Sequence, residues 1–293
     1  MKNAKALTIT YLTPVSFASL NGSDKEAENI SSIKKLSRGT EQFPYGSSQW
    51  VRRALRDQLK NLGWTLSEGE AAKIAKGAAT TEQKPDKYID DDLFGFMGTV
   101  KGQAATTRTS PVRVSPLVSL NKYEGDLDFG TNYMGVKAGG NPNIFETEIH
   151  SGIYRGTVLI ELDRVGCGDG FKDKKEELNS RERSKRVNSL LDAMKNLWSS
   201  GRQTRFLADI SPKFVAAAIL TTKNPIFLES VIPENGGVNA VILEEVLKDF
   251  KDEIKAVVFG ARKDMFSALP ESTITIGEAF NTMKKWVNEH YKS

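Results

Sequence analysis

The order in which the hydrophobic period changes along this chain constrains its fold more than any single motif. Residues 5–12 alternate apolar side chains with threonines, which is the period of a β-strand. Further strand and helix periods follow in a definite succession. They are a helix near 48–62, strands in SPVRVSPLVSL (110–120) and IHSGIYRGTVLIELD (149–163), a helix containing Val187 to Trp198, and a strand pair, RFLADI and FVAAAIL (205–210 and 214–220). The alanines of FVAAAIL leave a helix open for that segment.

The core succession is strand, helix, strand, strand, helix, strand, which is the order of ferredoxin-like and RNA-recognition-motif folds. We therefore predict an α+β fold and one elaborated domain over residues 1–293. A helical insertion is expected at 65–105, including an alanine-rich helix from Ser67 to Ala79. A mobile, extruded hairpin rich in Gly, Asn and Tyr is expected at 121–146. Residues 230–293 should extend the core with a helix near 238–250, a strand AVVFG and a final amphipathic helix.

The helix in GSSQWVRRALRDQLKNLGW has one apolar and one basic face. Ser47 or Ser48 can N-cap it, and Gly63 can end it in the left-handed conformation. The apolar face consists of Val51, Ala54, Leu55, Leu59 and Leu62, and the basic face of Arg52, Arg53, Arg56 and Lys60. Any soluble helix shows a charged outer face, so this pattern alone does not indicate a function.

The charge of the chain is mild overall but unevenly placed. A net charge of +4 and a pI near 8.9 do not by themselves indicate a polyanionic partner. Residues 31–60, however, hold seven lysines and arginines against two acids. Residues 99–119 hold Lys101, Arg108 and Arg113 and no acid, whereas residues 229–255 are mostly acidic.

The sequence lacks the residues that most chemistries need. The single cysteine, Cys167, cannot form an internal disulfide, and two histidines cannot build a zinc site. There is no phosphate-binding glycine loop, dinucleotide fingerprint or nucleophile elbow. We expect no catalytic residue, no metal and no cofactor. Because no stretch approaches about 18 apolar residues, we also expect a cytoplasmic protein without a membrane partner.

Three features allow a functional and a structural interpretation. His150 could be a general acid or base, but a lone strand histidine without a surrounding motif is more often structural. Asp90, Asp91 and Asp92 could bind a metal, but adjacent carboxylates at a helix start favour capping. FGFM (94–97) echoes the nucleic-acid signature of RNA-recognition motifs, yet acids precede it where that signature needs a basic residue and a glycine.

The distribution of basic residues indicates one possible function, the binding of a phosphate backbone. The basic helix, the cluster of Lys34, Lys35 and Arg38, and the acid-free segment 99–119 could line one groove. Such a groove would hold a phosphate backbone without reading bases. Free N–H groups at the helix start, near Ser47 to Gln49, would add anion-binding capacity.

Several motifs resemble one known family. SSQWVRRALR resembles the start-of-helix motif of CRISPR-associated Cascade backbone subunits, and SFASLNG, with Asn29 further on, resembles the polar loop after their first strand. DDDLFGFMG, RTSPVRVSPLVSL, DFGTN and FETEIHSGIYRGTVLIELDRVG resemble the DevR-type branch of type I-B systems. The resemblance covers most of residues 5–225 in the same order.

The resemblance implies a non-enzymatic protein shaped like a hand, with a modified RNA-recognition-motif palm, a helical finger region (65–105) and a thumb hairpin (121–146). Several copies would stack head to tail along a guide RNA (crRNA), beside other Cascade subunits. Target DNA would then pair with the guide, so that base pairing reads the sequence and the protein supplies a charged channel.

The resemblance and the charge pattern together give a set of expected RNA contacts. The helix motif would contact guide phosphates, Asn21 is a weaker match, and Tyr133 and Met134 are candidate base contacts in the thumb. Trp50 stands where a small polar residue is common, which leaves the entry angle of the helix open. The expected set is Asn21, Lys34, Lys35, Ser47, Ser48, Gln49, Arg52, Arg53, Arg56, Arg108, Arg113, Tyr133 and Met134.

Two other functions stay open at this point. A repeat-RNA-processing endoribonuclease can be built on the same topology and would use His150. A sequence-specific DNA-binding regulator would need a helix-turn-helix pattern, which the sequence lacks. The acidic stretch at 229–255 could pack against the basic edge of a neighbouring copy.

Overall fold

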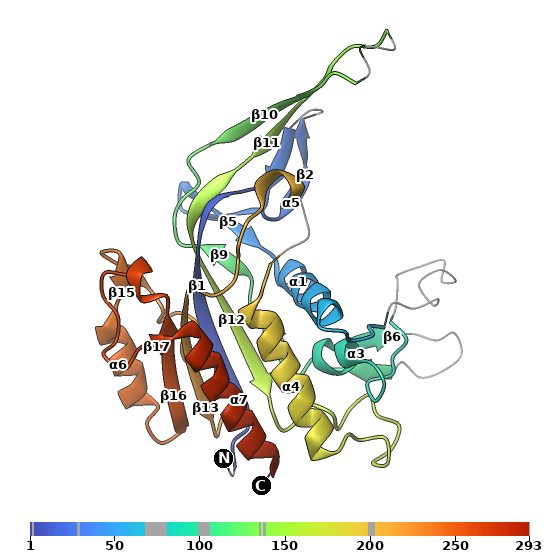
Figure 1. The fold of residues 1–293 in the computed structure, drawn as a ribbon, viewed down its shortest axis with the longest axis vertical. Helices are drawn as coiled ribbons and strands as arrows, with labels where there is room; N and C mark the ends of the chain where they lie inside the picture. Colours follow the sequence, from blue (N-terminus) through green and yellow to red (C-terminus); the bar gives the residue numbers. More distant parts are fainter. Residues whose placement is uncertain are drawn as a thin grey trace.

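The computed structural model describes residues 1, 3–27, 30–67, 81–98, 106–134, 136, 139–198 and 203–292. The fold is α+β and is organised around one large sheet (Figure 1). In spatial order its strands are β17 (Ile274–Thr275), β16 (Ile254–Ala261), β13 (Phe214–Leu220), β1 (Ala6–Ala18), β12 (His150–Glu161), β9 (Leu117–Ser119), β5 (Glu41–Gly46) and β4 (Lys35–Arg38). A short strand, β8 (Val112–Val114), also pairs with β12.

The centre of the sheet is buried on both faces. Strand β1 pairs antiparallel with β12 on one side and with β13 on the other. Every residue of β13 is buried, with Ala217 in the core beneath the helices and Ala216 in a second core on the opposite face. Small side chains fit between two covered faces, so FVAAAIL is a strand in spite of its alanines.

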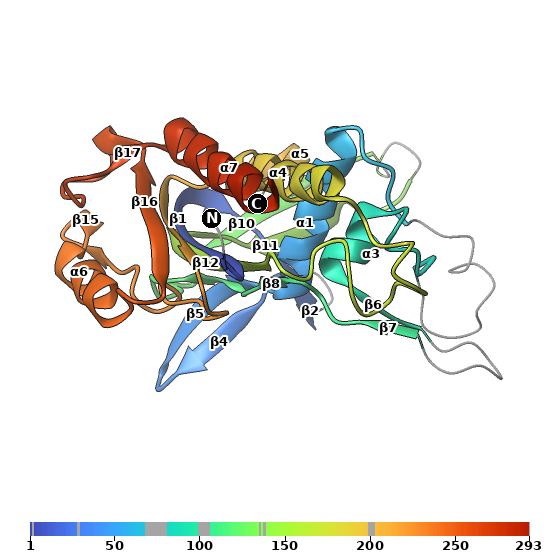
Figure 2. The same ribbon diagram turned by 90° about the horizontal axis from the view of Figure 1, so that it is seen from below.

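Three helices cover one face of this sheet: α1 (Ser48–Asn61), α4 (Ser180–Lys195) and α7 (Ile276–Lys292). Figure 2 shows them side by side above the strands. The opposite face is covered near β13 and β16 by α6 (Ala240–Asp249) and by the chain around a small hairpin of β14 (Pro233–Glu234) and β15 (Gly237–Val238). The predicted C-terminal extension therefore adds strands to the main sheet as well as helices.

Two further pieces project from the sheet. One is a four-stranded sheet in the order β10 (Leu127–Asn132), β11 (Asn143–Glu148), β3 (Ile30–Ile33) and β2 (Gly22–Ala27), whose β10–β11 hairpin extends furthest (Figure 1). The other contains α3 (Ile89–Phe94) and the pair β6 (Phe96–Gly98) and β7 (Thr106–Arg108). The alanine-rich helix predicted from Ser67 to Ala79 lies, apart from Ser67, outside the described residues.

Several predicted elements need correction. RFLADI is not a strand, because Gln203–Phe206 form a short helix, α5. The segment SPVRVSPLVSL forms two strands and not one, because Pro116 separates β8 from β9, and β9 pairs with both β12 and β5. The helix α4 ends at Lys195, and Trp198 instead makes an isolated bridge with Asp209.

No helix within the described ranges has both the length and the apolar character that crossing a membrane requires.

Candidate nucleic-acid interface

The start of α1 is fixed by contacts from the chain on either side of it. The side-chain oxygen of Asn21 accepts a hydrogen bond from the Ser47 backbone N–H at 2.9 Å. Ser47 in turn N-caps the helix, because its hydroxyl accepts from the Trp50 N–H at 3.3 Å. A Cβ on Gly46 would lie 2.5 Å from the Trp50 ring, so the indole packs on the glycine and determines how the chain enters the helix. Of the two serines predicted as possible caps, Ser47 is the N-cap and Ser48 is the first residue of the helix.

The first turn of α1 keeps part of its hydrogen-bonding capacity. The Ser47 N–H, predicted to be free, is used by Asn21. Among the described residues, no acceptor is found for the N–H groups of Ser48 and Gln49. The Ser48 hydroxyl donates to the Gln49 side-chain oxygen at 3.1 Å on the exposed surface. No acidic residue lies in this turn, so its positive end is not neutralised locally.

The arginines of α1 differ in their partners. Arg53 pairs with Asp57 at 2.9 Å within the helix. Arg56 lies 3.6 Å from the carboxylate of Asp90 and stacks over the ring of Phe94. Arg52 is half-buried, and its Nε is buried without any hydrogen-bond partner. Burial lowers the pKa of the Arg52 guanidinium, and no ion pair with a carboxylate is found for it among the described residues.

The apolar face of α1 is largely as predicted. The core between the helices and the sheet contains four residues of this face, namely Val51, Ala54, Leu55 and Leu59. Leu62 is exposed, because the helix ends at Asn61 and the chain turns away at Gly63, which has a φ of 88°.

In the basic cluster of Lys34, Lys35 and Arg38, the side chain of Lys35 makes contacts that stabilise the fold. Its ammonium lies 2.6 Å from the carboxylate of Glu148 and over the ring of Tyr123, and the lysine and glutamate side chains are both nearly buried. Glu148 also accepts the Ile33 N–H at 2.8 Å. This pair attaches β4 to the base of the β10–β11 hairpin, so the prediction of Lys35 as an RNA contact is replaced by a structural role. Lys34 is half-buried, and its side chain has no partner among the described residues.

The two arginines predicted from the acid-free segment do not join α1. The Arg108 side chain is completely buried. It bonds Asp92 and donates to the backbone oxygens of Cys167, Asp169 and Arg164. Although no acidic residue lies near Arg108 in the sequence, the fold brings acceptors to it from distant segments. Arg108 is therefore not available to RNA.

Arg113 is exposed, but its side chain lies on the face of the sheet opposite to α1. Val112 and Val114 enter the core beneath the helices, so Arg113 between them lies on the opposite face of the sheet. There its side chain, 59% exposed, lies 2.6 Å from Glu161. Lys101 lies outside the described residues, so the structure does not place the groove predicted for segment 99–119 beside α1.

The aspartates of α3 are neither caps nor a metal site in the described part of the chain. Tyr88 occupies the N-cap position without a side-chain bond, and all three aspartates are buried. Asp92 binds Arg108 and lies 2.9 Å from Arg186, which is also buried. Asp91 accepts the Lys84 N–H at 2.9 Å. Their role is to hold buried arginines and loop amides, and no metal-binding group of side chains is found among the described residues.

The β10–β11 hairpin carries the residues predicted to touch bases. The strands pair antiparallel from Leu127 opposite Glu148 to Asn132 opposite Asn143. Just beyond β10, Tyr133 is 62% and Met134 is 84% exposed. The Met134 N–H donates to the Asn132 side chain at 2.9 Å, which shapes the turn. An extruded hairpin in this region is therefore present, with two large apolar side chains available at its end.

His150 is placed poorly for acid–base catalysis on RNA. It is buried, and its Nε2 lies 3.0 Å from the Ser119 hydroxyl. Burial lowers its pKa, while Asp126 and Glu124 act to raise it. The cavity of about 400 Å³ beside it is also bordered by these two acids, which would repel a phosphodiester.

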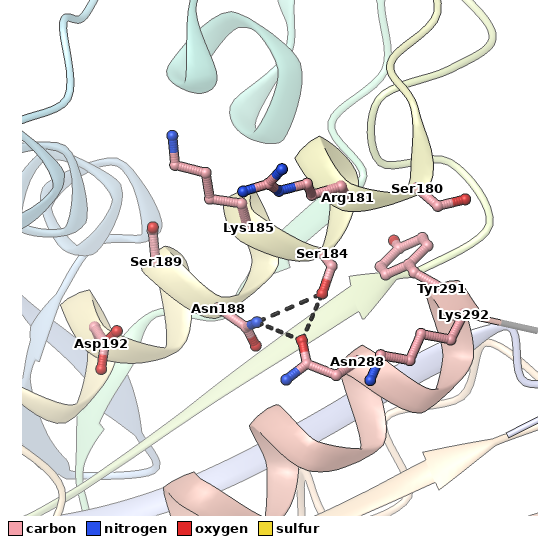
Figure 3. A pocket seen from close by; sticks show the side chains of 10 residues that line it. All are labelled: Ser180, Arg181, Ser184, Lys185, Asn188, Ser189, Asp192, Asn288, Tyr291 and Lys292. Carbon is pink, nitrogen blue, oxygen red and sulfur yellow. Dashed lines mark hydrogen bonds between the residues drawn. The ribbon is translucent and has the colours of Figure 1, made fainter.

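A second surface lies on the helical face, in the groove of about 540 Å³ between α4 and α7. Figure 3 shows Asn288 of α7 between Ser184 and Asn188 of α4. The Asn288 oxygen accepts hydrogen bonds from Ser184 at 2.7 Å and from Asn188 at 2.8 Å. These bonds join the two helices, so the centre of the groove serves packing.

Comparison with known proteins shows the family and the fold of this chain. The fold is α+β, and the N-terminus of α1 carries arginines and N–H groups that can bind an anion. These features are typical of nucleic-acid-binding proteins. The family described as CRISPR-associated negative auto-regulator DevR/Csa2 matches residues 9–238, and this chain belongs to that family.

Two relatives and two solved structures place the chain more closely. The CRISPR-associated protein Cas7/Cst2/DevR of Myxococcus xanthus (strain DK1622) is 28% identical over 272 residues, 86% of this chain and 85% of the relative. The aCascade subunit Cas7/Csa2 2 of Saccharolobus solfataricus is 28% identical over 153 residues, 49% and 46% of the two chains. A chain of a CRISPR RNA-guided surveillance complex, pre-nicking, has a TM-score of 0.63 at 14% identity, covering 96% of this chain and 99% of its own. A second surveillance-complex chain gives 0.58 at 16% identity with the same coverage. These structures share the fold.

Proposed function

We propose that this chain is the guide-RNA (crRNA)-binding backbone subunit of a type I CRISPR Cascade surveillance complex. It polymerises along the guide and supports pairing of the guide with target DNA, without catalysis, metal or cofactor. The family match and the relatives, one of them named as an aCascade subunit, support this function. The type I-B assignment stays a prediction, as does the cytoplasm, where such a complex would act.

The observation that carries the proposal is the state of Arg52. Arg52 is half-buried and has no ion-pair partner among the described residues, so an anion on its solvent side would balance its charge. The N–H groups of Ser48 and Gln49, at the start of the same helix, are free to donate to the same anion. Phosphates of an RNA backbone can balance the guanidinium charge from the solvent side and accept from the helix N–H groups, although the buried Nε is out of their direct reach. Asn21 supports the site by holding Ser47. We keep Ser47, Ser48, Gln49, Arg52, Arg53, Arg56 and Lys34 as proposed contacts or supports.

The sheet supports a ferredoxin-like palm. The predicted succession corresponds to β1, α1, the two short strands β8 and β9, β12, α4 and β13. Both helices lie on one face of an antiparallel sheet. In this interpretation the β10–β11 hairpin is the thumb, with Tyr133 and Met134 toward bases. The region around α3 belongs to the finger, and residues 230–293 extend the palm.

Head-to-tail assembly would use the acidic side of the molecule. Glu244 and Glu245 are exposed on α6, at the other end of the sheet from α3 in Figure 1. We propose that they face a basic edge of the next copy. Reversing both charges should shorten assemblies on RNA at low salt, measured by sedimentation; an unchanged length would remove this interface.

The decisive experiment is to express the protein beside a repeat–spacer array, purify it and sequence the RNA that copurifies. Uniform small RNAs that contain spacer sequence are expected. Purified protein should also leave repeat RNA intact. Metal-free cutting that His150→Ala abolishes would replace the proposal with the endoribonuclease alternative.

A further inference from the structure

An exposed aromatic side chain lies at the end of β1, where a strand residue would normally be covered. Phe17 is 47% exposed although residues 6–13 of the same strand are all buried. The pairing of β1 with β12 explains this exposure. Val15 is opposite Gly152 but Ala18 is opposite His150, so β1 contains one extra residue at this point. Such a bulge re-aims side chains and is common next to functional sites.

Phe17 belongs to a cluster of rings and one cation. Its ring centroid lies 5.6 Å from that of Phe206 in α5. The guanidinium of Arg205 lies over Phe206 at 5.0 Å and over Phe145 of β11 at 4.7 Å. Arg205 is itself held by Asp128 and, at 3.1 Å, by the Thr147 hydroxyl. The cluster therefore joins β1, α5 and the hairpin in a defined arrangement, and the Phe17 ring keeps about half of its surface uncovered.

The cluster lies close to the start of α1. Phe17 precedes Asn21 by four residues, so their Cα atoms are at most about 14 Å apart. Asn21 contacts Ser47 directly. Figures 1 and 2 both place α5 on the same face of the sheet as α1. A span of about 14 Å corresponds to roughly four nucleotides at the stacking distance of 3.4 Å.

We propose that Phe17, supported by Phe206 and Arg205, is a stacking platform for a nucleobase of the strand whose phosphates α1 holds. This inference rests on the proposed function and adds a base contact outside the β10–β11 hairpin. An exposed ring beside a fixed arginine provides the two contacts that single-stranded nucleic acids use without sequence preference, namely stacking and cation–π interaction. The surroundings of the ring are mixed: the bulge residue is Ser16 and the arginine is held by Asp128 and Thr147, whereas Leu207, next to Phe206, is 79% exposed. A contact with a protein partner is therefore an outcome of the test below.

The test uses the full chain and a single-stranded guide RNA, with Kd measured over a range of salt concentrations. Phe17→Ala should weaken binding by about 5- to 150-fold, because loss of one stacked base costs roughly 1–3 kcal/mol. The salt slope should stay unchanged, since no phosphate contact is lost. Phe17→Trp should retain binding, and Phe17→Leu, which keeps the contact with Phe206 but not the aromatic face, should weaken it. Thermal unfolding of each variant verifies that the fold is intact.

A second readout separates stacking from simple proximity. The tryptophan fluorescence of Phe17→Trp, corrected with the unmodified protein, should be quenched by RNA but not by inorganic polyphosphate, which carries phosphates without bases. Equal RNA affinity of Phe17→Ala and the unmodified protein would overturn the inference alone, as would full affinity of Phe17→Leu. A change in self-association without a change in RNA affinity would assign Phe17 to a protein contact instead. Absence of RNA binding by the unmodified protein would overturn the proposed function as well.

Discussion

The arginines around α3 and the arginines of α1 have the same side chain in opposite situations. Arg108 and Arg186 are buried and share the carboxylate of Asp92, and backbone oxygens accept further hydrogen bonds from each guanidinium. The Nε of Arg186 is buried without a hydrogen bond, but it lies 3.7 Å from the carboxylate of Glu182. Arg52 is only half-buried, yet it has a buried Nε without an acceptor. Burial alone therefore does not distinguish a structural arginine from a binding one. The distinction is whether the fold supplies a counter-ion, which Arg108 and Arg186 have in Asp92 and which Arg52 lacks among the described residues.

Removing the shared acceptor should have the largest effect. Asp92→Asn removes the closest counter-ion of two buried guanidinium groups and leaves only carboxylates at 3.7 Å or more, so we expect the free energy of unfolding to fall by about 3–5 kcal/mol. Denaturant unfolding measures this loss. The matched control is Glu229→Gln, which removes the exposed partner of Arg155 and should cost at most about 1 kcal/mol. Similar losses in both variants would contradict the structural role of Asp92.

Removing the unsatisfied arginine should affect binding and not folding. Arg52→Ala should weaken guide-RNA binding by roughly 1.5–3 kcal/mol, the contribution of a hydrogen bond to a charged group, for all RNA sequences alike. The salt slope should fall by about one unit, since one phosphate contact is lost. The free energy of unfolding should stay within about 0.5 kcal/mol. An unchanged slope would show that Arg52 is only part of a solvated face.

Arg56 lies between the two regions and should show both effects in part. It pairs with Asp90 of α3 and stacks over Phe94, yet it belongs to the basic face of α1. Arg56→Ala should reduce the free energy of unfolding by about 1–2 kcal/mol through the lost stacking and ion pair. It should also weaken RNA binding across all sequences and lower the salt slope. A stability loss with unaltered RNA binding would move Arg56 into the structural group.

His150 extends the comparison to a group that is buried and neutral. Burial lowers its pKa in the folded state, so the fold favours the uncharged ring. The stability contributed by this group is present above the pKa of the unfolded chain, near 6.5, and is lost as the pH falls toward the lower folded value. Unfolding measured from pH 8 to pH 5 should show this loss, and His150→Gln should reduce its slope. A stability that rises on acidification would contradict the burial of a neutral ring.

Arg113 should give the smallest effect. It is exposed, faces away from α1, and shares Glu161 with Lys223 and Arg164. Arg113→Ala should change neither the salt slope of RNA binding nor the free energy of unfolding by more than about 0.5 kcal/mol. A loss of affinity equal to that of Arg52→Ala would show that nucleic acid also binds the opposite face of the sheet.

Much of the fold could be predicted from local patterns because those patterns have local causes. The apolar stripe of α1, the cap at Ser47 and the left-handed Gly63 are satisfied within a few residues of one another. The alternation of β1 and β12 fixes which side chains enter the core. The errors occurred where tertiary contacts overrode propensity: α5 replaced a predicted strand, and the helical period continued to Trp198 although α4 ends at Lys195.

The sequence by itself determined the succession of elements, the basic helix with its SSQ start, and the hairpin that bears Tyr133 and Met134. Only the tertiary structure decided which cations remain for a ligand. Asp92 meets Arg108 from 16 residues away and Arg186 from 94, and Lys35 meets Glu148 across 113 residues. Sequence patterns report charge along the chain, whereas the availability of a charge depends on acceptors that the fold brings from distant segments.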